Sequence, residues 1–200
     1  MKRLYAILIL ALMVFALNAC DNSNSTNTIS VVELTEREDA ILSTTSDKSF
    51  VFDFNIDNAH KEVSVWTEKY ESGELVDDKL SHITTEVEES GSIIFATSKT
   101  NEKEIQSTFN IGIESNGGTY SISNFDTNSK VLDNMSSVWG NFQGEETSNQ
   151  GEIVLANICY SEDENTMSSL STDFYEDPEG HMDELEEYDV VYLLKAEFIK

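Results

Sequence analysis

A dense acidic run near the C-terminus offers the most obvious chemistry in the sequence. Nine Asp and Glu side chains fall between positions 173 and 189. Carboxylate oxygens are the ligands that Ca²⁺ prefers, so Asp173, Glu176, Asp177 and Glu179 are the candidate ligands of a weak Ca²⁺ site. Their spacing does not match the EF-hand loop, and the main prediction is therefore a solvated acidic loop or helix face. A docking surface for a basic partner, in which charge steers the encounter, is the third interpretation.

Histidine and cysteine form no catalytic or zinc-binding pattern. His60, His82 and His181 are far apart, and neither an HExxH sequence nor a Cys/His cluster with zinc spacing occurs. We expect His60 to be solvated, because it falls in a loop between two expected strands. Cys159 falls inside an expected strand, where a small buried side chain is a better interpretation than a redox thiol or a dimer disulfide.

The chain carries none of the local motifs of hydrolases or nucleotide-binding enzymes. It has no G-x-S-x-G, no S-x-x-K and no G-x-x-x-x-G-K-[ST] sequence. We therefore expect a protein that is not an enzyme and has no cofactor. An enzyme whose residues come together only in the folded chain is the alternative.

The N-terminus has the layout of a secretory signal peptide. Lys2 and Arg3 precede an apolar run from Leu4 to Leu17, and a small residue and a polar stretch follow. The run is shorter than the roughly 20 residues that span a bilayer as a helix. We therefore expect residues 1–19 to be removed, and a retained transmembrane anchor is the alternative.

Leu17-Asn18-Ala19-Cys20 resembles the lipobox of bacterial lipoproteins. Three of the four positions match the usual pattern, whereas Asn18 stands where a small or β-branched residue is usual. The resemblance implies cleavage after Ala19 and a diacylglyceryl thioether on Cys20, whose thiolate is the nucleophile. Two or more acyl chains hold a protein at a membrane effectively permanently. A lipid anchor on the extracytoplasmic face of the cell membrane is the resulting expectation.

The charge balance excludes one class of partner. The 200 residues include 12 Lys and Arg against 38 Asp and Glu, a net charge of −26. Contacts with nucleic acid phosphates need clustered basic residues, so we expect no nucleic acid partner. Loss of the signal peptide would leave 10 basic residues and a charge of −28. Such a domain is repelled by anionic headgroups, so we expect membrane contact through Cys20 alone.

Composition favours a folded domain after a short polar segment. Residues 20–30 are expected to form the tether, in which Asp21–Thr28 would reach about 16 Å. Residues 31–200 are expected to form a single β-rich domain, because 19 aromatic residues and a single proline argue against disorder. A short helix is predicted within 31–43, where Thr35 and Glu38 make a capping box. Its expected apolar side comprises Leu34, Ala40, Ile41 and Leu42.

Apolar residues alternate with polar ones along most of the remaining chain, which is typical of half-buried strands. Asn116-Gly117-Gly118 is a strong hairpin signal. Val138, Trp139 and Phe142 are expected core residues. The clearest strands are predicted at 50–56, 62–70, 92–98, 108–114, 119–125, 152–160 and 188–200, and 75–87 is weakly extended.

These elements predict an antiparallel β-sandwich, immunoglobulin-like in outline, with one short N-terminal helix; a barrel is the alternative. We expect a monomeric, membrane-anchored lipoprotein that binds another extracytoplasmic protein or a ligand. One alternative is an inhibitory or immunity lipoprotein that blocks a cationic protein or peptide. The other is an enzyme with a site assembled in the fold.

Overall fold

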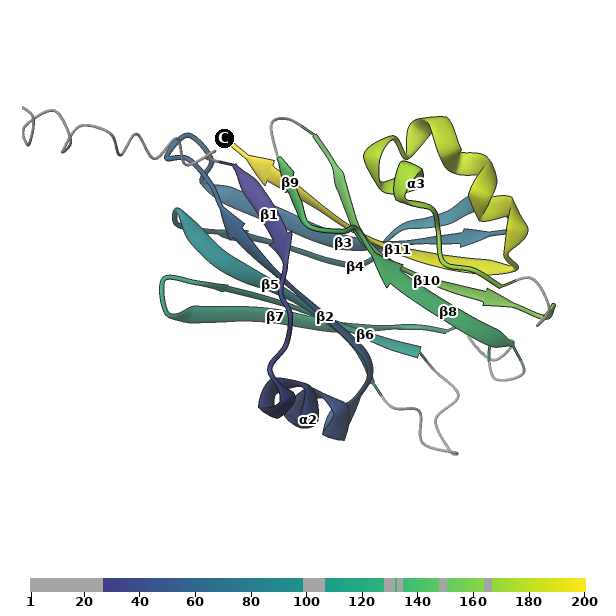
Figure 1. Ribbon diagram of the computed structural model, residues 1–200. Helices are drawn as coiled ribbons and strands as arrows, with labels where there is room; N and C mark the ends of the chain where they lie inside the picture. Colours follow the sequence, from purple (N-terminus) through teal and green to yellow (C-terminus); the bar gives the residue numbers. More distant parts are fainter. Residues whose placement is uncertain (1–26, 99–106, 128–131, 133–134, 148–150, 164–166) are drawn as a thin grey trace, which may run out of the picture.

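Two antiparallel sheets packed face to face make up the described part of the protein (Figure 1). The computed structural model describes residues 27–98, 107–127, 132, 135–147, 151–163 and 167–200. The expected signal peptide, the lipobox and most of the expected tether lie outside these residues. The described strands do not close into a barrel, and the β-sandwich prediction is confirmed.

Each sheet contains strands from both halves of the chain. The first sheet has the order β7-β6-β5-β2-β1-β9. Its strands are β1 (Thr28–Val31), β2 (Ser46–Asn55), β5 (Ser90–Ser98), β6 (Ser107–Ser115), β7 (Gly118–Asp126) and β9 (Glu145–Thr147). The second sheet has the order β4-β3-β11-β10-β8. Its strands are β3 (Glu62–Glu71), β4 (Glu74–Glu86), β8 (Ser136–Asn141), β10 (Ile153–Ser161) and β11 (Val190–Ile199).

The predicted alternation places aromatic side chains between the sheets. Phe52 on β2 is fully buried and stacks on Phe142, with ring centroids 5.6 Å apart. Phe109 on β6 packs against Tyr192 on β11 at 4.6 Å. These pairs join the two sheets, so burial of large apolar surface is the main source of stability for the sandwich.

Two buried lysines tie the sheets together along their sides. On the β4/β7 side, the Lys69 ammonium on β3 lies 2.9 Å from the Asp126 carboxylate on β7. The Tyr192 hydroxyl donates to the same carboxylate at 2.7 Å. Burial by itself would lower the pKa of Lys69, but its contacts with Glu71 and Asp126 outweigh that effect and raise it. Lys69 therefore stays charged, and its charge is matched.

On the β8 side, the Lys48 ammonium on β2 lies 4.7 Å from the ring centroid of Trp139. The expectation of a buried Trp139 is wrong, because 51% of its surface is exposed. The physical reason is that β8 is the last strand of its sheet, so a large side chain there is only partly covered. Phe142, one residue beyond β8, is buried as expected.

The predicted helix is present as α2 (Glu36–Thr45), and its capping box is confirmed. The Thr35 hydroxyl accepts from the Glu38 amide at 3.3 Å, and the Glu38 carboxylate accepts from the Thr35 amide at 2.8 Å. The expected apolar side does not become a core-facing side, because no residue of α2 is buried and Ile41 is 61% exposed. The helix therefore forms from its local signals, although none of its residues is buried.

The acidic run folds as a cap over the outer face of the second sheet, where α3 (Thr172–Glu176) and the 3₁₀ segment η2 (Glu179–Glu187) lie against β10 and β11 (Figure 1). We call residues 167–189 the acidic cap. Phe174 and Leu185 are fully buried on the inner side of the cap. The Tyr175 hydroxyl donates to the side chain of Asn157 on β10 at 2.5 Å. The cap is thus a packed layer whose acids lie on its outer side.

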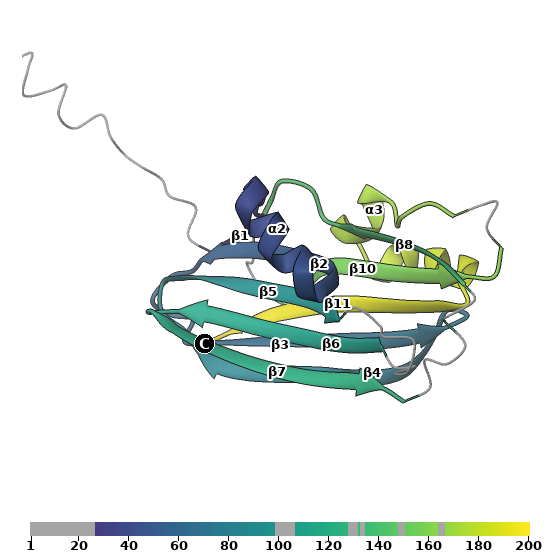
Figure 2. The same ribbon diagram turned by 90° about the horizontal axis from the view of Figure 1, so that it is seen from below.

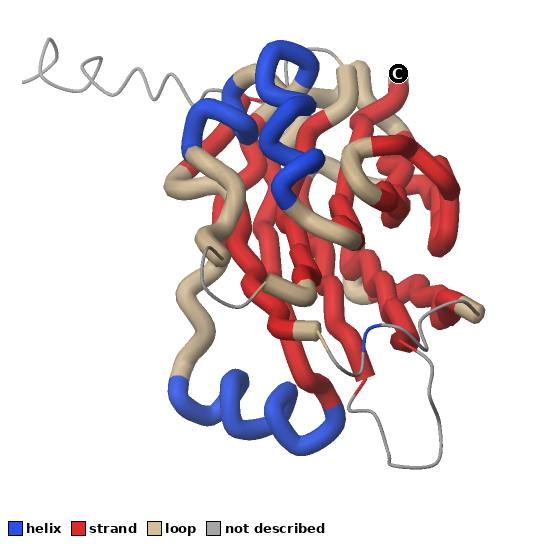
Figure 3. The backbone as a smooth tube through the Cα atoms, turned by 90° about the vertical axis from the view of Figure 1, so that its right-hand side faces the viewer, coloured by secondary structure: helices blue, strands red, loops and turns tan. Residues whose placement is uncertain are grey.

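Antiparallel pairing collects the turns at two ends of the sandwich. The described chain enters at Asn27, whose amide donates to the Asn55 carbonyl, and the Lys61 amide donates to Ile199 near the C-terminus. We call this the N-terminal end. The β3–β4 turn and the end of β7 lie at the opposite, far end (Figure 2). The helix α2 joins the far-end tips of β1 and β2, at the bottom of Figure 3, whereas the C-terminus is at the top.

Gly91 on β5 is expected to be essential for packing of the first sheet. A Cβ at this position would collide with the Glu114 carbonyl oxygen and the Phe54 ring. A Cβ on Gly112 of neighbouring β6 would meet nothing closer than 3.7 Å. We expect Gly91→Ala to lower the free energy of unfolding by about 1–3 kcal/mol, and Gly112→Ala to change it by less than about 0.5 kcal/mol. Urea unfolding of both variants measures the difference, and equal effects would contradict this packing.

Candidate binding sites

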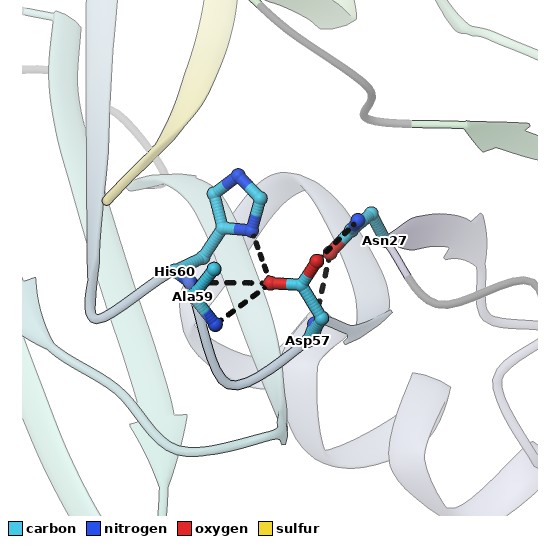
Figure 4. A network of polar contacts seen from close by, with 4 residues as sticks. All are labelled: Asn27, Asp57, Ala59 and His60. Atoms are coloured by element: carbon cyan, nitrogen blue, oxygen red, sulfur yellow. Dashed lines mark hydrogen bonds and ion pairs between the residues drawn. The ribbon is translucent and has the colours of Figure 1, made fainter.

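A network centred on Asp57 organises the N-terminal end (Figure 4). Asp57 follows β2 at the start of the turn to β3. Its carboxylate accepts hydrogen bonds from the Asn27 amide group at 3.1 Å and from the Ala59 backbone at 2.9 Å. The Asn27 side chain in turn accepts from the Asp57 backbone at 2.8 Å. The carboxylate therefore ties the entry of the chain to the β2–β3 turn.

His60 belongs to the same network, and the expectation that it is solvated is wrong. Its exposed fraction is 5%, and its Nδ1 lies 2.8 Å from the Asp57 carboxylate. The turn folds back so that Asp57 and His60 meet three residues apart. Hydrogen bonds from Asn27 and then His60 hold the pKa of Asp57 well below its usual range. Because this carboxylate is ionised, the proton of the His60 ring lies on Nδ1.

A hollow of about 520 Å³ lies beside this network. Asp57 and His60 line it together with Glu88, Glu89 and Lys61. An Asp–His pair can orient a general base, but catalysis of the triad type also needs a nucleophile hydrogen-bonded to the histidine. Among the described residues, hydrogen bonds join the His60 ring to Asp57 and to no hydroxyl or thiol group. The structural role of holding the turn is therefore enough to explain the contact between Asp57 and His60.

The acidic cap uses some of its carboxylates internally and exposes the others. Glu184 accepts from the backbone and hydroxyl of Ser171, and Asp189 accepts from the Glu162 amide at 2.8 Å. The Ca²⁺ candidates Asp173, Glu176, Asp177 and Glu179 are all exposed, although the Asp177 carboxylate also accepts from the Gly180 amide at 3.2 Å. No three His, Cys, Asp or Glu residues of the described chain form a group that could hold a metal ion. The described structure therefore gives no support to a Ca²⁺ site at these four residues.

Cys159 is buried beneath the acidic cap, as the sequence predicts. Burial raises the pKa of its thiol to about 12, although the Asn157 amide donates to the sulfur at 3.0 Å. A protonated, fully buried thiol is a poor nucleophile and is not accessible to a second chain. These properties argue against a redox role and against a dimer disulfide.

Exposed apolar side chains gather at the far end. Leu75 and Val76 on β4 and Phe125 on β7 each expose about half of their surface. Val76 and Phe125 line one hollow of about 450 Å³, whose wall includes the buried Lys69. We call Leu75, Val76 and Phe125 the far-end apolar group. The sequence analysis missed this group, because alternation along a strand does not show where a sheet ends.

A family model described as the YgaN domain matches residues 28–198, which include both sheets and the acidic cap. Comparisons with curated proteins and with solved structures gave no significant match. In the described part of the chain, no helix is both long and apolar enough to cross a membrane.

Replacement of Asp57 by Asn is expected to remove a contribution to the free energy of unfolding that depends on pH in the acidic range. The folded pKa of Asp57 is depressed, so its contribution is complete above the ordinary value of about 3.9 and is lost as pH falls through the folded value. The difference in unfolding free energy between wild type and Asp57→Asn should therefore shrink below about pH 4. Urea unfolding between neutral and acidic pH measures it, with exposed Asp78→Asn as the control. A difference that does not change with pH would contradict the assignment.

Proposed function

The chain belongs to the YgaN domain family, and within this family we propose that it is a lipid-anchored binding module on the extracytoplasmic face of the cell membrane, without enzymatic activity. One observation carries the proposal: the far-end apolar group lies at the opposite end of the sandwich from Asn27, where the chain enters. A membrane anchor at one end and an exposed apolar surface at the other suit a protein that presents a binding surface away from the membrane.

The anchor is proposed from the sequence. Seven residues separate Cys20 from Thr28, the first residue of β1. A flexible segment of seven residues has an r.m.s. end-to-end distance of about 15 Å, which is the separation we propose between the lipid and the N-terminal end. Strand β3 has ten residues, and a strand of that length places the far end roughly 34 Å beyond. The far-end apolar group is therefore positioned for a partner that approaches from outside.

The chemistry of the far end favours a protein partner. Leu75, Val76 and Phe125 offer apolar surface, and charged residues around them, including Asp77 and Lys79, offer polar contacts at the rim. An apolar centre with a polar rim is the usual anatomy of a protein–protein interface. The exposed Ile41 of α2 adds apolar surface at the same end. We therefore propose another extracytoplasmic protein as the occupant.

A second candidate is an inhibitory or immunity lipoprotein that blocks a cationic protein. The acidic cap favours it, since Asp183, Glu186 and Glu187 are exposed on the η2 segment of a packed layer. Attraction of this kind weakens as salt screens the charges. Capture of a cationic protein should be lost at high salt and in the Asp183→Asn, Glu186→Gln, Glu187→Gln variant. That result would support the inhibitory function over binding through the far-end apolar group.

The anchor is tested by labelling cells with a fatty-acid probe. Cys20→Ala is expected to abolish labelling of the protein, because the acyl group has no thiol to attach to. Cys159→Ala is the matched control, since it removes the second cysteine of the chain and should leave labelling intact. Labelling of the Cys20→Ala protein would overturn the anchor.

The far end is tested by photo-crosslinking in intact cells. A photoreactive residue at Leu75 or Phe125 is expected to give a discrete adduct with an extracytoplasmic protein. The same residue at Tyr120 is the control, because Tyr120 is an exposed aromatic near the N-terminal end of β7. Adducts of equal yield from Tyr120, or none from the far end, would contradict the proposed surface.

A further inference from the structure

His60 has one ring nitrogen without a partner at the N-terminal end. The side chain is only 5% exposed and its Nδ1 is bound to Asp57, whereas its Nε2 has no hydrogen-bond partner among the described residues. In Figure 4 this nitrogen points away from Asp57. Within the described chain, the buried polar side-chain atoms that lack a partner are the hydroxyls of Thr67 and Ser81. Nε2 is not among them, so solvent reaches this nitrogen through the hollow that His60 lines.

The state of this ring makes Nε2 an acceptor. The proton lies on Nδ1, where the Asp57 carboxylate accepts it, so Nε2 carries a lone pair. The bond to Asp57 also fixes the orientation of the ring. A ligand that donates a hydrogen bond to Nε2 would therefore meet an acceptor that is already in place.

Three segments of the chain form the hollow of about 520 Å³ around this nitrogen, which we call the N-terminal hollow. They are the β2–β3 turn, the link from β4 to β5, and the β6–β7 turn, which contributes Asn116. The Asn116 amide donates to the Glu88 carboxylate at 2.7 Å, and the Glu88 backbone donates to the Ser115 hydroxyl at 3.0 Å. The volume is within the range of small-molecule sites, and walls that are joined beforehand lower the entropic cost of binding.

A smaller hollow of about 170 Å³ adjoins the first and shares Val87, Glu88 and Asn116 with it. Its lining adds Glu86 and Tyr120. Tyr120 lies on the edge strand β7, and half of its surface is exposed. The smaller hollow therefore adds an accessible aromatic ring to the same end of the sandwich.

Carboxylates outnumber basic groups in the lining of the two hollows. Glu86, Glu88 and Glu89 join the ionised Asp57, and Lys61 is the one basic residue among the described residues of the lining. The carboxylates of Glu86 and Glu89 have no hydrogen bond or ion pair with the described residues. A ligand that suits this lining carries positive charge and donates hydrogen bonds, because charge-assisted bonds are the strong ones.

An organic ammonium ligand fits these groups better than a metal ion does. No three His, Cys, Asp or Glu side chains of the described chain form a group that could hold a metal. An alkylammonium group donates hydrogen bonds to carboxylates and to a nitrogen lone pair, and it is attracted to the face of an aromatic ring. The acceptors are spread over two hollows, so a chain with several ammonium groups can reach more of them than a single group can.

We propose that the N-terminal hollow and the smaller hollow beside it bind a linear aliphatic polyamine. One ammonium group donates to His60 Nε2 and pairs with Glu89. A second pairs with Glu86 near the Tyr120 ring, and the methylene groups between them cover Val87. The site lies at the opposite end of the sandwich from the far-end apolar group and involves neither that group nor the anchor, so it goes beyond the proposed function.

The test is isothermal titration calorimetry of spermidine with the full-length protein in micelles of a non-ionic detergent. We expect saturable binding that persists at physiological salt, where diffuse attraction to a highly acidic protein is screened. Glu89→Gln should weaken binding about fivefold or more, and Tyr120→Ala about threefold. Asp78→Asn is the matched control, because it removes the same charge from an exposed residue at the far end and should leave the affinity unchanged. Butylamine, which has a single ammonium group, should bind clearly more weakly than spermidine.

A second measurement follows the histidine side chains by nitrogen-15 spectroscopy. Spermidine should shift the Nε2 resonance of His60, because its lone pair accepts a hydrogen bond, and should leave His82 and His181, the other two histidines, unchanged. His181 lies in the acidic cap, so it reports diffuse attraction to that surface.

Absence of saturable binding would overturn the proposal. Equal effects of Glu89→Gln and Asp78→Asn, equal affinity for butylamine, or a shift of His181 in place of His60 would also overturn it. Photo-crosslinking from Leu75 and Phe125 concerns a different surface and a protein partner, so failure of the polyamine site is distinguishable from failure of the proposed function.

Discussion

The organisation of this protein depends on one constraint, the packing of two antiparallel sheets over a shared aromatic core. Phe52, Phe109, Phe142 and Tyr192 fill the space between the sheets. Because the strands are antiparallel, the turns between the long strands fall at one of two ends. The buried lysines Lys48 and Lys69 then join the sheets along the two sides, each with a matched partner. The N-terminal end and the far end both follow from this arrangement.

The positions of the acidic residues in the fold show what many of them do. In the cap, acids on the outer side cover apolar residues on the inner side, as Phe174 and Leu185 show. Carboxylates such as Glu184 and Asp189 also serve as hydrogen-bond acceptors that hold the cap together. The acids therefore form the outer side of a packed layer, and this layer reaches the β3–β4 turn, where Glu186 lies against Gly73.

Local signals in the sequence predicted the elements well, because strand alternation and the Thr35–Glu38 capping box act over a few residues. The predictions from the sequence were wrong for residues whose surroundings are set by tertiary structure. Trp139 looked like a core residue, but its strand is at the edge of a sheet. His60 looked solvated, but Asp57 and the turn enclose it. The partner of Lys69 on β7 and the walls of the N-terminal hollow join segments distant in sequence, which no local pattern reveals.

The central claim is that the protein is held at the membrane by its N-terminal end and presents its far end outward. Energy transfer from a fluorophore on the lipidated protein to acceptor headgroups in vesicles measures this orientation. Asn58→Cys places the fluorophore at the N-terminal end, and Glu74→Cys places it at the far end, while buried Cys159 is protected from labelling. The account predicts clearly stronger transfer from position 58 than from position 74. Equal transfer from both positions, or stronger transfer from position 74, would contradict it.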